Sequence, residues 1–149
     1  MRRFAVAKGF EDKGVILPTR STTGSAGYDI RVLDGATILP HEKIIFHTGV
    51  KAYMEKDEVL MIYIRSSAGI KKGLSLANSV PVIDSDYADN EETDGHIMLA
   101  IVNNSSVPVT IENNERVAQG VFIKYLTTDD DNVNKERTGG IGSTNKKYH

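Results

Sequence analysis

The sequence predicts an all-β domain. About ten short apolar or alternating segments follow one another along the chain, and turn-forming residues separate them at spacings of roughly 8 to 12 residues. No stretch keeps the 3.6-residue periodicity of an amphipathic helix. A sandwich, a jelly roll and a barrel all agree with this pattern.

Composition restricts the class of protein. The 149 residues suit one domain and contain no internal repeat, so we expect residues 1–149 to form a single unit. The chain has no cysteine, which excludes disulfides and thiolate metal sites and agrees with a reducing cytoplasm. A net charge of -2 with both signs mixed does not indicate a nucleic-acid or membrane surface. With no membrane-length apolar run and no signal peptide, we expect a cytoplasmic protein.

The first strand candidates lie in the N-terminal third. A short apolar piece, residues 15–18, precedes a Thr/Ser/Gly-rich loop that leads into an alternating strand at 28–32. Asp29 lies where this loop enters the strand, and taken alone it is typical of a turn-capping aspartate. Two further strand-like runs, 36–39 and 43–53, follow.

A polar loop with phosphate-binding chemistry follows the next apolar run. Residues 59–64 are nearly all apolar, which indicates a strand covered on both faces. Residues 65–73, RSSAGIKKG, combine two hydroxyls, two glycines and three cations. Small residues let backbone amides approach a ligand, while hydroxyls and cations suit a polyphosphate. A polar loop with one helical turn explains the same residues equally well, and the Walker pattern is absent.

Residues 78–87, NSVPVIDSDY, carry the most distinctive pattern. An apolar run ends in Asp84 and Asp86, spaced i and i+2, with Tyr87 directly behind them. In a strand this spacing places both carboxylates on one face, where they repel each other. A metal clamp, a general base positioned by its neighbour, or a solvated strand end would each explain the pair.

The last third adds further strands and a glycine-rich terminus. Residues 88–95 are acidic and unpatterned, and we expect an exposed loop. Strand candidates follow at 96–102, 107–111 and 116–126. Residues 127–136 contain three consecutive aspartates and should be mobile. The terminal ERTGGIGSTNKKYH has phosphate-binding chemistry and also the composition of a disordered terminus.

Five of these segments, in this order and at this spacing, resemble the five motifs of the trimeric deoxyuridine triphosphatases (dUTPases). They are SAGYDI (25–30), RSSAGIKKG (65–73), NSVPVIDSDY (78–87), ERVAQ (115–119) and RTGGIGST (137–144). The resemblance covers nearly the whole chain. It implies a β-clip or distorted jelly-roll-like barrel, a homotrimer with shared active sites, and a mobile C-terminal arm over residues 127–149. The implied activity is Mg²⁺-dependent hydrolysis of dUTP to dUMP and pyrophosphate, which keeps uracil out of DNA and supplies dUMP.

The resemblance also implies residue roles. Asp84 matches the general base that activates water for attack on the α-phosphorus. Tyr87 matches the ring that packs on the sugar and excludes a 2′-hydroxyl. The residues that match base and sugar contacts are Asn78, Val82, Ile83, Tyr87 and Ile141, of which Val82 and Ile83 act through their backbone.

Phosphate and metal contacts are implied in the same way. Asp29 matches a group that touches Mg²⁺ only through water, as suits an ion that keeps much of its hydration shell. Arg116 is expected to be a structural salt-bridge partner. The matching phosphate-binding residues are Arg65, Ser66, Ser67, Gln119, Arg137, Gly142, Ser143 and Thr144.

Three features depart from the family pattern. Pro81 stands where glycine is usual, and it has no N–H to donate. Ile141 replaces a common phenylalanine and gives up aromatic stacking on the base, so we expect weaker substrate affinity. Residues 88–94 are longer than the usual link after the tyrosine and are expected to project from the surface.

Two alternatives remain open. An exposed acidic loop at 88–94 would suit a contact with a regulatory protein partner. A dCTP deaminase-like trimer of the same fold is the other, although it requires a catalytic glutamate and a different end to the chain.

Overall fold

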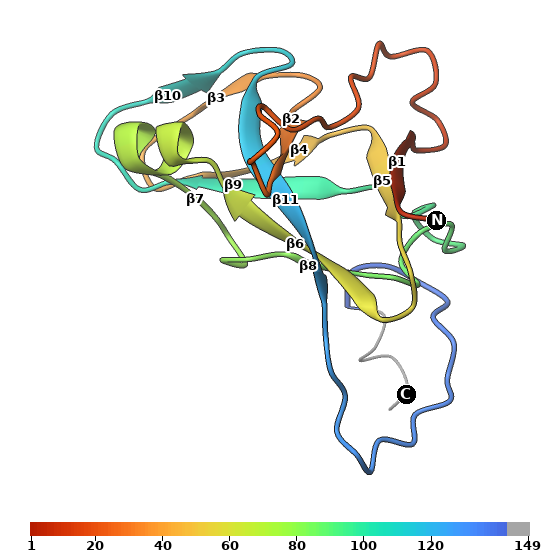
Figure 1. The fold of residues 1–149 in the computed structure, drawn as a ribbon. Coiled ribbons are helices and arrows are strands. Elements are labelled where there is room, and N and C mark those ends of the chain that lie inside the picture. The colour runs from red at the N-terminus through yellow and green to blue at the C-terminus, as the bar shows by residue number, and fades with distance from the viewer. Residues whose placement is uncertain (143–149) are drawn as a thin grey trace.

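The structure is a computed structural model that describes residues 1–142, and short strands make up nearly all of its regular structure (Figure 1). One turn of π-helix, η1 (Ser67–Lys71), interrupts the strands. The all-β prediction is confirmed for this part of the chain, in which no helix is long and apolar enough to cross a membrane. In chain order the strands are β1 (Arg3–Val6), β2 (Tyr28–Arg31), β3 (Ala36–Ile38), β4 (Lys43–His47), β5 (Val50–Tyr53), β6 (Glu58–Ile64), β7 (Leu74–Leu76), β8 (Val82–Asp84), β9 (Met98–Asn103), β10 (Val109–Ile111) and β11 (Arg116–Lys124).

The strands pair antiparallel in four sheets within residues 1–142. The largest has the order β2-β11-β6-β8, and a second has the order β4-β9-β7. Two small sheets pair β1 with β5 and β3 with β10. Because these sheets remain separate, the expected barrel is distorted and open rather than one closed ring of hydrogen-bonded strands.

The core forms where the inward faces of these sheets meet. Strand β9 shows why the sequence folds this way, because Leu99 and Ile101 are fully buried while the alternate Met98 and Ala100 are half-buried. Burying such side chains stabilises the fold by roughly 1.5 to 3 kcal/mol each. The largest fully buried apolar side chains in this core are Ile30, Ile38, Leu60, Ile62, Ile97, Leu99, Ile101 and Ile111.

Several strands differ from the sequence prediction, and β1 was not predicted at all. The expected strand at 43–53 breaks into β4 and β5 at Gly49, whose φ of +75° lies in the left-handed region that favours glycine. A Cβ added to Gly49 would also lie 2.5 Å from Cγ2 of Val15. Strand β7 was not predicted, since three residues are too few to establish a period.

After β11 the chain leaves the sheets. Residues 125–142 contain no strand or helix, and Figure 1 shows them looping out and returning towards β8. From here on, the arm means residues 125–142, which include the described part of the C-terminal arm expected from the sequence. Its return places Arg137 beside the carboxylates that follow the apolar run of β8.

Candidate functional site: two pockets at opposite ends of β6

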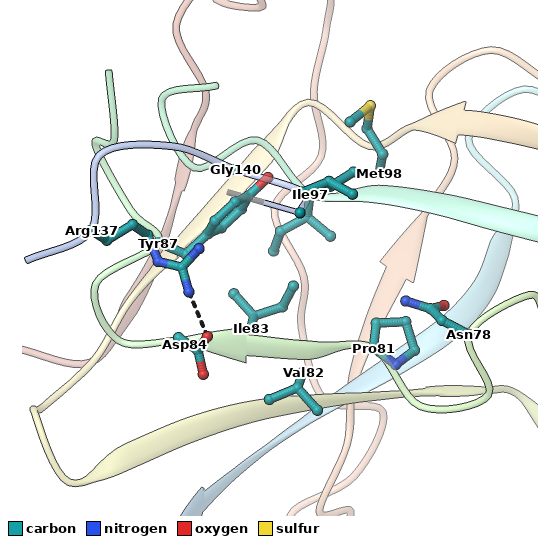
Figure 2. A pocket seen from close by; sticks show the side chains of 12 residues that line it. Asn78, Pro81, Val82, Ile83, Asp84, Tyr87, Ile97, Met98, Arg137 and Gly140 are labelled. Atoms are coloured by element: carbon teal, nitrogen blue, oxygen red, sulfur yellow. Dashed lines mark hydrogen bonds and ion pairs between the residues drawn. The ribbon is translucent and has the colours of Figure 1, made fainter. Parts of the chain in front are cut away.

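The residues predicted to contact base and sugar line one pocket of about 280 Å³ (Figure 2). Strand β8 and the turn before it form one wall, and the arm forms another. The start of β9 completes the lining. The lining residues are Asn78, Pro81, Val82, Ile83, Asp84, Tyr87, Ile97, Met98, Arg137, Gly140, Ile141 and Gly142.

Side chains alternate between the two faces of β8, and this alternation determines which of them points into the first pocket. Ile83 points into it, whereas Val82 points the other way and is 55% exposed (Figure 2). Pro81 fits this sheet edge despite its missing N–H, because its carbonyl accepts a hydrogen bond of 3.0 Å from the Ile62 N–H. The side chain of Val82 is therefore free of the pocket, in agreement with a role expected only for its backbone.

Arg137 brings the two carboxylates of the i, i+2 pair together. Its Nη2 lies 2.7 Å from Oδ2 of Asp84 and its Nε lies 2.8 Å from Oδ1 of Asp86. One guanidinium, with a side chain only 13% exposed, thus offsets the repulsion between two acids that are each about half exposed. The guanidinium of Arg137, which belongs to the arm, therefore bridges the two carboxylates.

Tyr87 is held rigidly at the side of this pocket. Its hydroxyl donates a 2.7 Å hydrogen bond to the carbonyl of His96, and the residue is only 9% exposed. The guanidinium carbon of Arg137 lies 5.8 Å from the centre of the Tyr87 ring. The Tyr87 ring is therefore held at its hydroxyl by the His96 carbonyl, and the Arg137 guanidinium lies over its face.

A second pocket of about 230 Å³ collects the predicted phosphate-binding residues of the central motifs. The loop after β6 supplies Arg65, and η1 provides the one helical turn that was the alternative explanation for this segment. Hydroxyls and a guanidinium line the pocket, which suits an anion. Its lining residues are Ser21, Ser25, Gly27, Asp29, Arg65, Ser66, Ser67 and Gln119.

Asp29 is the acidic centre of this second pocket. Its Oδ1 lies 3.3 Å from Nε of Arg65, and its Oδ2 lies 3.5 Å from Nη1 of Arg116. Ser21 donates a 2.8 Å hydrogen bond to Oδ2. Arg116 is thus the salt-bridge partner expected from the sequence, and two guanidiniums flank the single carboxylate of Asp29.

Gln119 reaches the pocket because Gly27 leaves room for it. The register places Gln119 opposite both Asp29 of β2 and Tyr63 of β6. A Cβ on Gly27 would lie 2.3 Å from Oε1 and 3.0 Å from Cβ of Gln119. Any larger residue at position 27 would push this side chain away.

Strand β6 separates the two pockets within one chain. Val59, near its start, is paired with Asp84, whereas Arg65 follows its last residue. A strand advances about 3.3 Å per residue, so six residues separate the backbones of these two positions by roughly 20 Å. The predicted phosphate-binding residues therefore divide between the two pockets of one chain. Arg65, Ser66, Ser67 and Gln119 line the second pocket, whereas Arg137 and Gly142 line the first beside the base and sugar set.

Several lining residues were missed by sequence reasoning. Ser21 and Ser25 stand in the Ser/Thr-rich loop before β2, where the hydroxyl cluster was a usable signal. Ile97 and Met98 gave none, since they look like ordinary strand residues. The glycine-rich end is only partly described: Ile141 and Gly142 line the first pocket, with Ile141 78% exposed, while the predicted Ser143 and Thr144 lie outside the described residues.

The segment 88–95 agrees with expectation only in part. It is an irregular loop in which Asp89, Glu91 and Glu92 are exposed as predicted, whereas Asn90 is only 8% exposed and Gly95 is buried. The N–H of Gly140 donates a 3.1 Å hydrogen bond to Oε2 of Glu92, so the arm touches this segment. The acidic composition of this segment does not indicate its contact with the arm, because Glu92 and Gly140 are 48 residues apart in the sequence.

Comparison with known proteins gives consistent results. The sequence model of the dUTPase family matches residues 13–145. Deoxyuridine 5′-triphosphate nucleotidohydrolase of Lactococcus lactis subsp. lactis is 47% identical over 146 residues, which cover 97% of each chain. The crystal structure of dUTPase from Streptococcus mutans is similar with a TM-score of 0.78 and 42% identity, covering 85% of this chain and 98% of that one. A dUTPase of Staphylococcus aureus phage φ11, described as coordinating a structural Mg(II) ion, shares the fold at 18% identity and a TM-score of 0.72, covering 91% and 97%.

Proposed function

The chain belongs to the dUTPase family, and from this premise we propose that it hydrolyses dUTP to dUMP and pyrophosphate as a homotrimer with active sites shared between subunits. The separation along β6 carries this proposal. Asp84 is paired with Val59 near one end of β6 and Arg65 follows the other end, a separation of about 20 Å along the β6 backbone. A nucleotide whose base occupies the first pocket therefore takes its phosphate contacts from the second pocket of a neighbouring copy.

Exposed apolar side chains support an assembly. Three of them lie at the end of β11 and along the arm: Ile123 is 40% exposed, Leu126 97% and Val133 74%. Exposed apolar side chains at these positions are available for another chain to cover. A neighbouring subunit would bury them.

In the proposed reaction, Asp84 takes a proton from water as the water oxygen attacks the α-phosphorus. The bond from that phosphorus to the α,β-bridging oxygen breaks, and pyrophosphate leaves. Arg65, Ser66 and Ser67 of the neighbouring copy stabilise the charge that develops on the phosphate oxygens. Arg137 has to release Asp84 for this step, and the triphosphate is the anion that draws it away.

Selectivity follows from the first pocket. Tyr87, held by its hydroxyl, offers a flat wall that packs on deoxyribose and leaves no room for a 2′-hydroxyl. Asn78 and the β8 backbone read the uracil edge. Cytosine would bring an amino group against these donors, and unpaired buried polar groups carry a heavy penalty. Ile141 covers the base without aromatic stacking.

Magnesium fits the second pocket only together with the nucleotide. Asp29 is its single carboxylate, and residues 1–142 contain no group of three or more His, Cys, Asp or Glu side chains placed to hold a metal ion. The two guanidiniums beside Asp29 attract a triphosphate rather than a bare cation. Mg²⁺ would supply charge neutralisation on the phosphate oxygens, with Asp29 reaching it through water.

The test is Asp84→Asn, which keeps the shape of the side chain and removes its basicity. We expect this variant to lose turnover by a factor of about 10² to 10⁴ while retaining nucleotide binding. Pyrophosphate release from dUTP, UTP, dCTP and dTTP, with and without Mg²⁺, measures the activity. Wild-type turnover in the variant would remove Asp84 from its role, and ammonia release from dCTP would favour the deaminase alternative.

A further inference from the structure

We propose that residues 88–95, which we call the docking loop, position the arm over the active site through Glu92 and Thr93. The inference rests on the proposed function, because it explains how the arm is directed at the first pocket. In this arrangement Glu92 and Thr93 are positioning residues. They touch the arm and no reacting atom.

The contact between the docking loop and the arm is specific. The N–H of Gly140 donates its 3.1 Å hydrogen bond to Oε2 of Glu92. A Cβ added to Gly140 would lie 2.8 Å from Cγ2 and 3.4 Å from Oγ1 of Thr93. Gly139 and Gly140 are buried, whereas the flanking Thr138 and Ile141 are exposed. Only a glycine fits at position 140. We call its contact with Glu92 and Thr93 the seat.

Asn90 makes the docking loop rigid from within. Its Nδ2 donates to the Tyr87 carbonyl at 2.6 Å and to Oγ1 of Thr93 at 2.7 Å. Its Oδ1 accepts from the N–H groups of Glu92 and Thr93 at 3.0 and 2.9 Å. One buried amide thus fixes both arm-contacting residues and ties them to Tyr87.

The acidic residues of the docking loop anchor it to β5. Lys51 pairs with Asp89 at 2.6 Å and with Asp94 at 2.9 Å, and the Tyr53 hydroxyl donates to Asp89 at 2.7 Å. Burial acts to lower the pKa of Lys51, but its hydrogen bonds to the two aspartates outweigh this and raise it. The hydrogen bond from Lys51 likewise lowers the pKa of Asp89. Asp89 and Asp94 thus hold the docking loop on β5, although the Asp89 side chain remains 54% exposed.

Two attachments three residues apart set the course of the arm. Arg137 is clamped by Asp84 and Asp86, and Gly140 is seated against Glu92 and Thr93. All four partners belong to one segment, 84–95, which also contains Tyr87. The chain that continues past Gly140 is thereby aimed along the first pocket, where Ile141 and Gly142 form part of the wall.

A steric rescue tests the seat. Gly140→Ala should drive the new methyl into Thr93, undock the arm and lower dUTP turnover by roughly tenfold or more. The φ of Gly140 is not in the left-handed region, so alanine adds no backbone strain. Thr93→Ser removes Cγ2 but keeps the hydroxyl that bonds Asn90, so the double variant should return to within about threefold of Thr93→Ser alone. An equal loss in the double variant would overturn the seat.

Two further readouts separate the seat from the proposed function. Glu92→Ala should lower turnover more than Glu91→Ala, which removes the same charge from an exposed neighbouring side chain; equal effects would contradict the contact. Trypsin cleavage after Lys135 and Arg137 should accelerate in Gly140→Ala and slow again in the double variant. This assay needs no catalysis, so a wild-type protein that fails to hydrolyse dUTP would refute the function while the protease pattern still decides the seat.

Discussion

At the scale of single residues, small side chains decide how the second pocket is shaped. Gly27 illustrates this, because Gln119 occupies the space that a Cβ would take, with its Oε1 2.3 Å from the Cβ position. Gln119 is the residue proposed to act near the phosphate, whereas the residue that permits its position is Gly27, directly before β2. Substitution at position 27 should therefore act on turnover rather than on folding.

We expect Gly27→Ala to lower dUTP turnover by roughly tenfold to a hundredfold, since a displacement of about 1 Å near the reacting phosphate is costly. Gly24→Ala is the matched control, because nothing lies within 4 Å of its Cβ position and its φ is not in the left-handed region. Steady-state kinetics on both variants checks the prediction. Equal rates would mean that Gln119 tolerates displacement.

His96 makes stability depend on pH. Its ring stacks against Phe10 and against His47 at centroid distances of 4.4 and 5.2 Å, and its Nε2 accepts a hydrogen bond from the Gly49 N–H at 3.0 Å. Burial, with a contribution from the nearby His47, lowers the pKa of His96 from 6.5 to about 4. The folded protein therefore holds this ring neutral while the unfolded chain protonates it.

The sign of the effect follows from this shift. Above pH 6.5 both states are neutral at His96 and its contribution is complete; between pH 6.5 and 4 the unfolded state gains a proton, so stability falls by up to about 3 kcal/mol. Urea unfolding at fixed protein concentration should show this loss in the wild type. His96→Gln, which keeps an acceptor but does not titrate, should lose less over the same range. A parallel decline in both proteins would assign the effect to other groups.

Residue identities predicted more of the site than residue positions did. The residue types of the loop that begins at Arg65 indicated phosphate chemistry, with a polar loop as an equal explanation, whereas the roles expected of Asp84 and Asp29 came from the family resemblance. Nothing in the pattern placed Glu92 beside Gly140, since 48 residues separate them and neither type is distinctive. Contacts between glycine backbone and a surface acid leave no periodic signal.

At the scale of elements, the length of β6 sets the distance between Asp84 and Arg65, and the arm after β11 forms one wall of the first pocket. The sequence predicted β6 well because seven residues with nearly continuous apolar character indicate a buried strand. It did not predict the break between β4 and β5, which depends on the left-handed φ of Gly49 and its contact with Val15. Short elements such as β7 and η1 depend on tertiary contacts that propensity does not report.

Removal of the arm's end should separate catalysis from folding. We expect truncation after Lys135 to lower dUTP turnover by about a hundredfold or more, since Arg137 and the glycine-rich end are lost, while the strands, which end at Lys124, stay folded. Truncation after Asn145 is the control, because it keeps the last motif whole. Turnover and circular dichroism on both proteins decide the matter; an unchanged rate in the shorter one would show that the arm has no part in the reaction.

At the scale of the whole molecule, the division of the site between two pockets argues for a symmetric oligomer. In a cyclic trimer each interface repeats, so a single pairing of a first pocket with a neighbour's second pocket generates three equivalent sites. Residue patterns alone do not predict this geometry, because the pairing of Asp84 with the start of β6, far from Arg65, depends on strand register. A one-residue change of register would turn the side chains of β8 to the opposite face.

Mixed trimers test the shared site directly. Asp84→Asn and Arg65→Ala chains should each be inactive alone, because every site in either homotrimer lacks one group. After the two are unfolded together in equal amounts and refolded, random assembly should give about a quarter of the sites an intact Asp84 from one copy and an intact Arg65 from the next. Pyrophosphate release should then recover to about a quarter of the wild-type rate. Mixing without unfolding keeps the homotrimers intact and serves as the control. If both groups acted within one chain, no arrangement of these variants would reunite them and the refolded mixture would stay inactive, so recovery distinguishes a site between subunits from a site inside one.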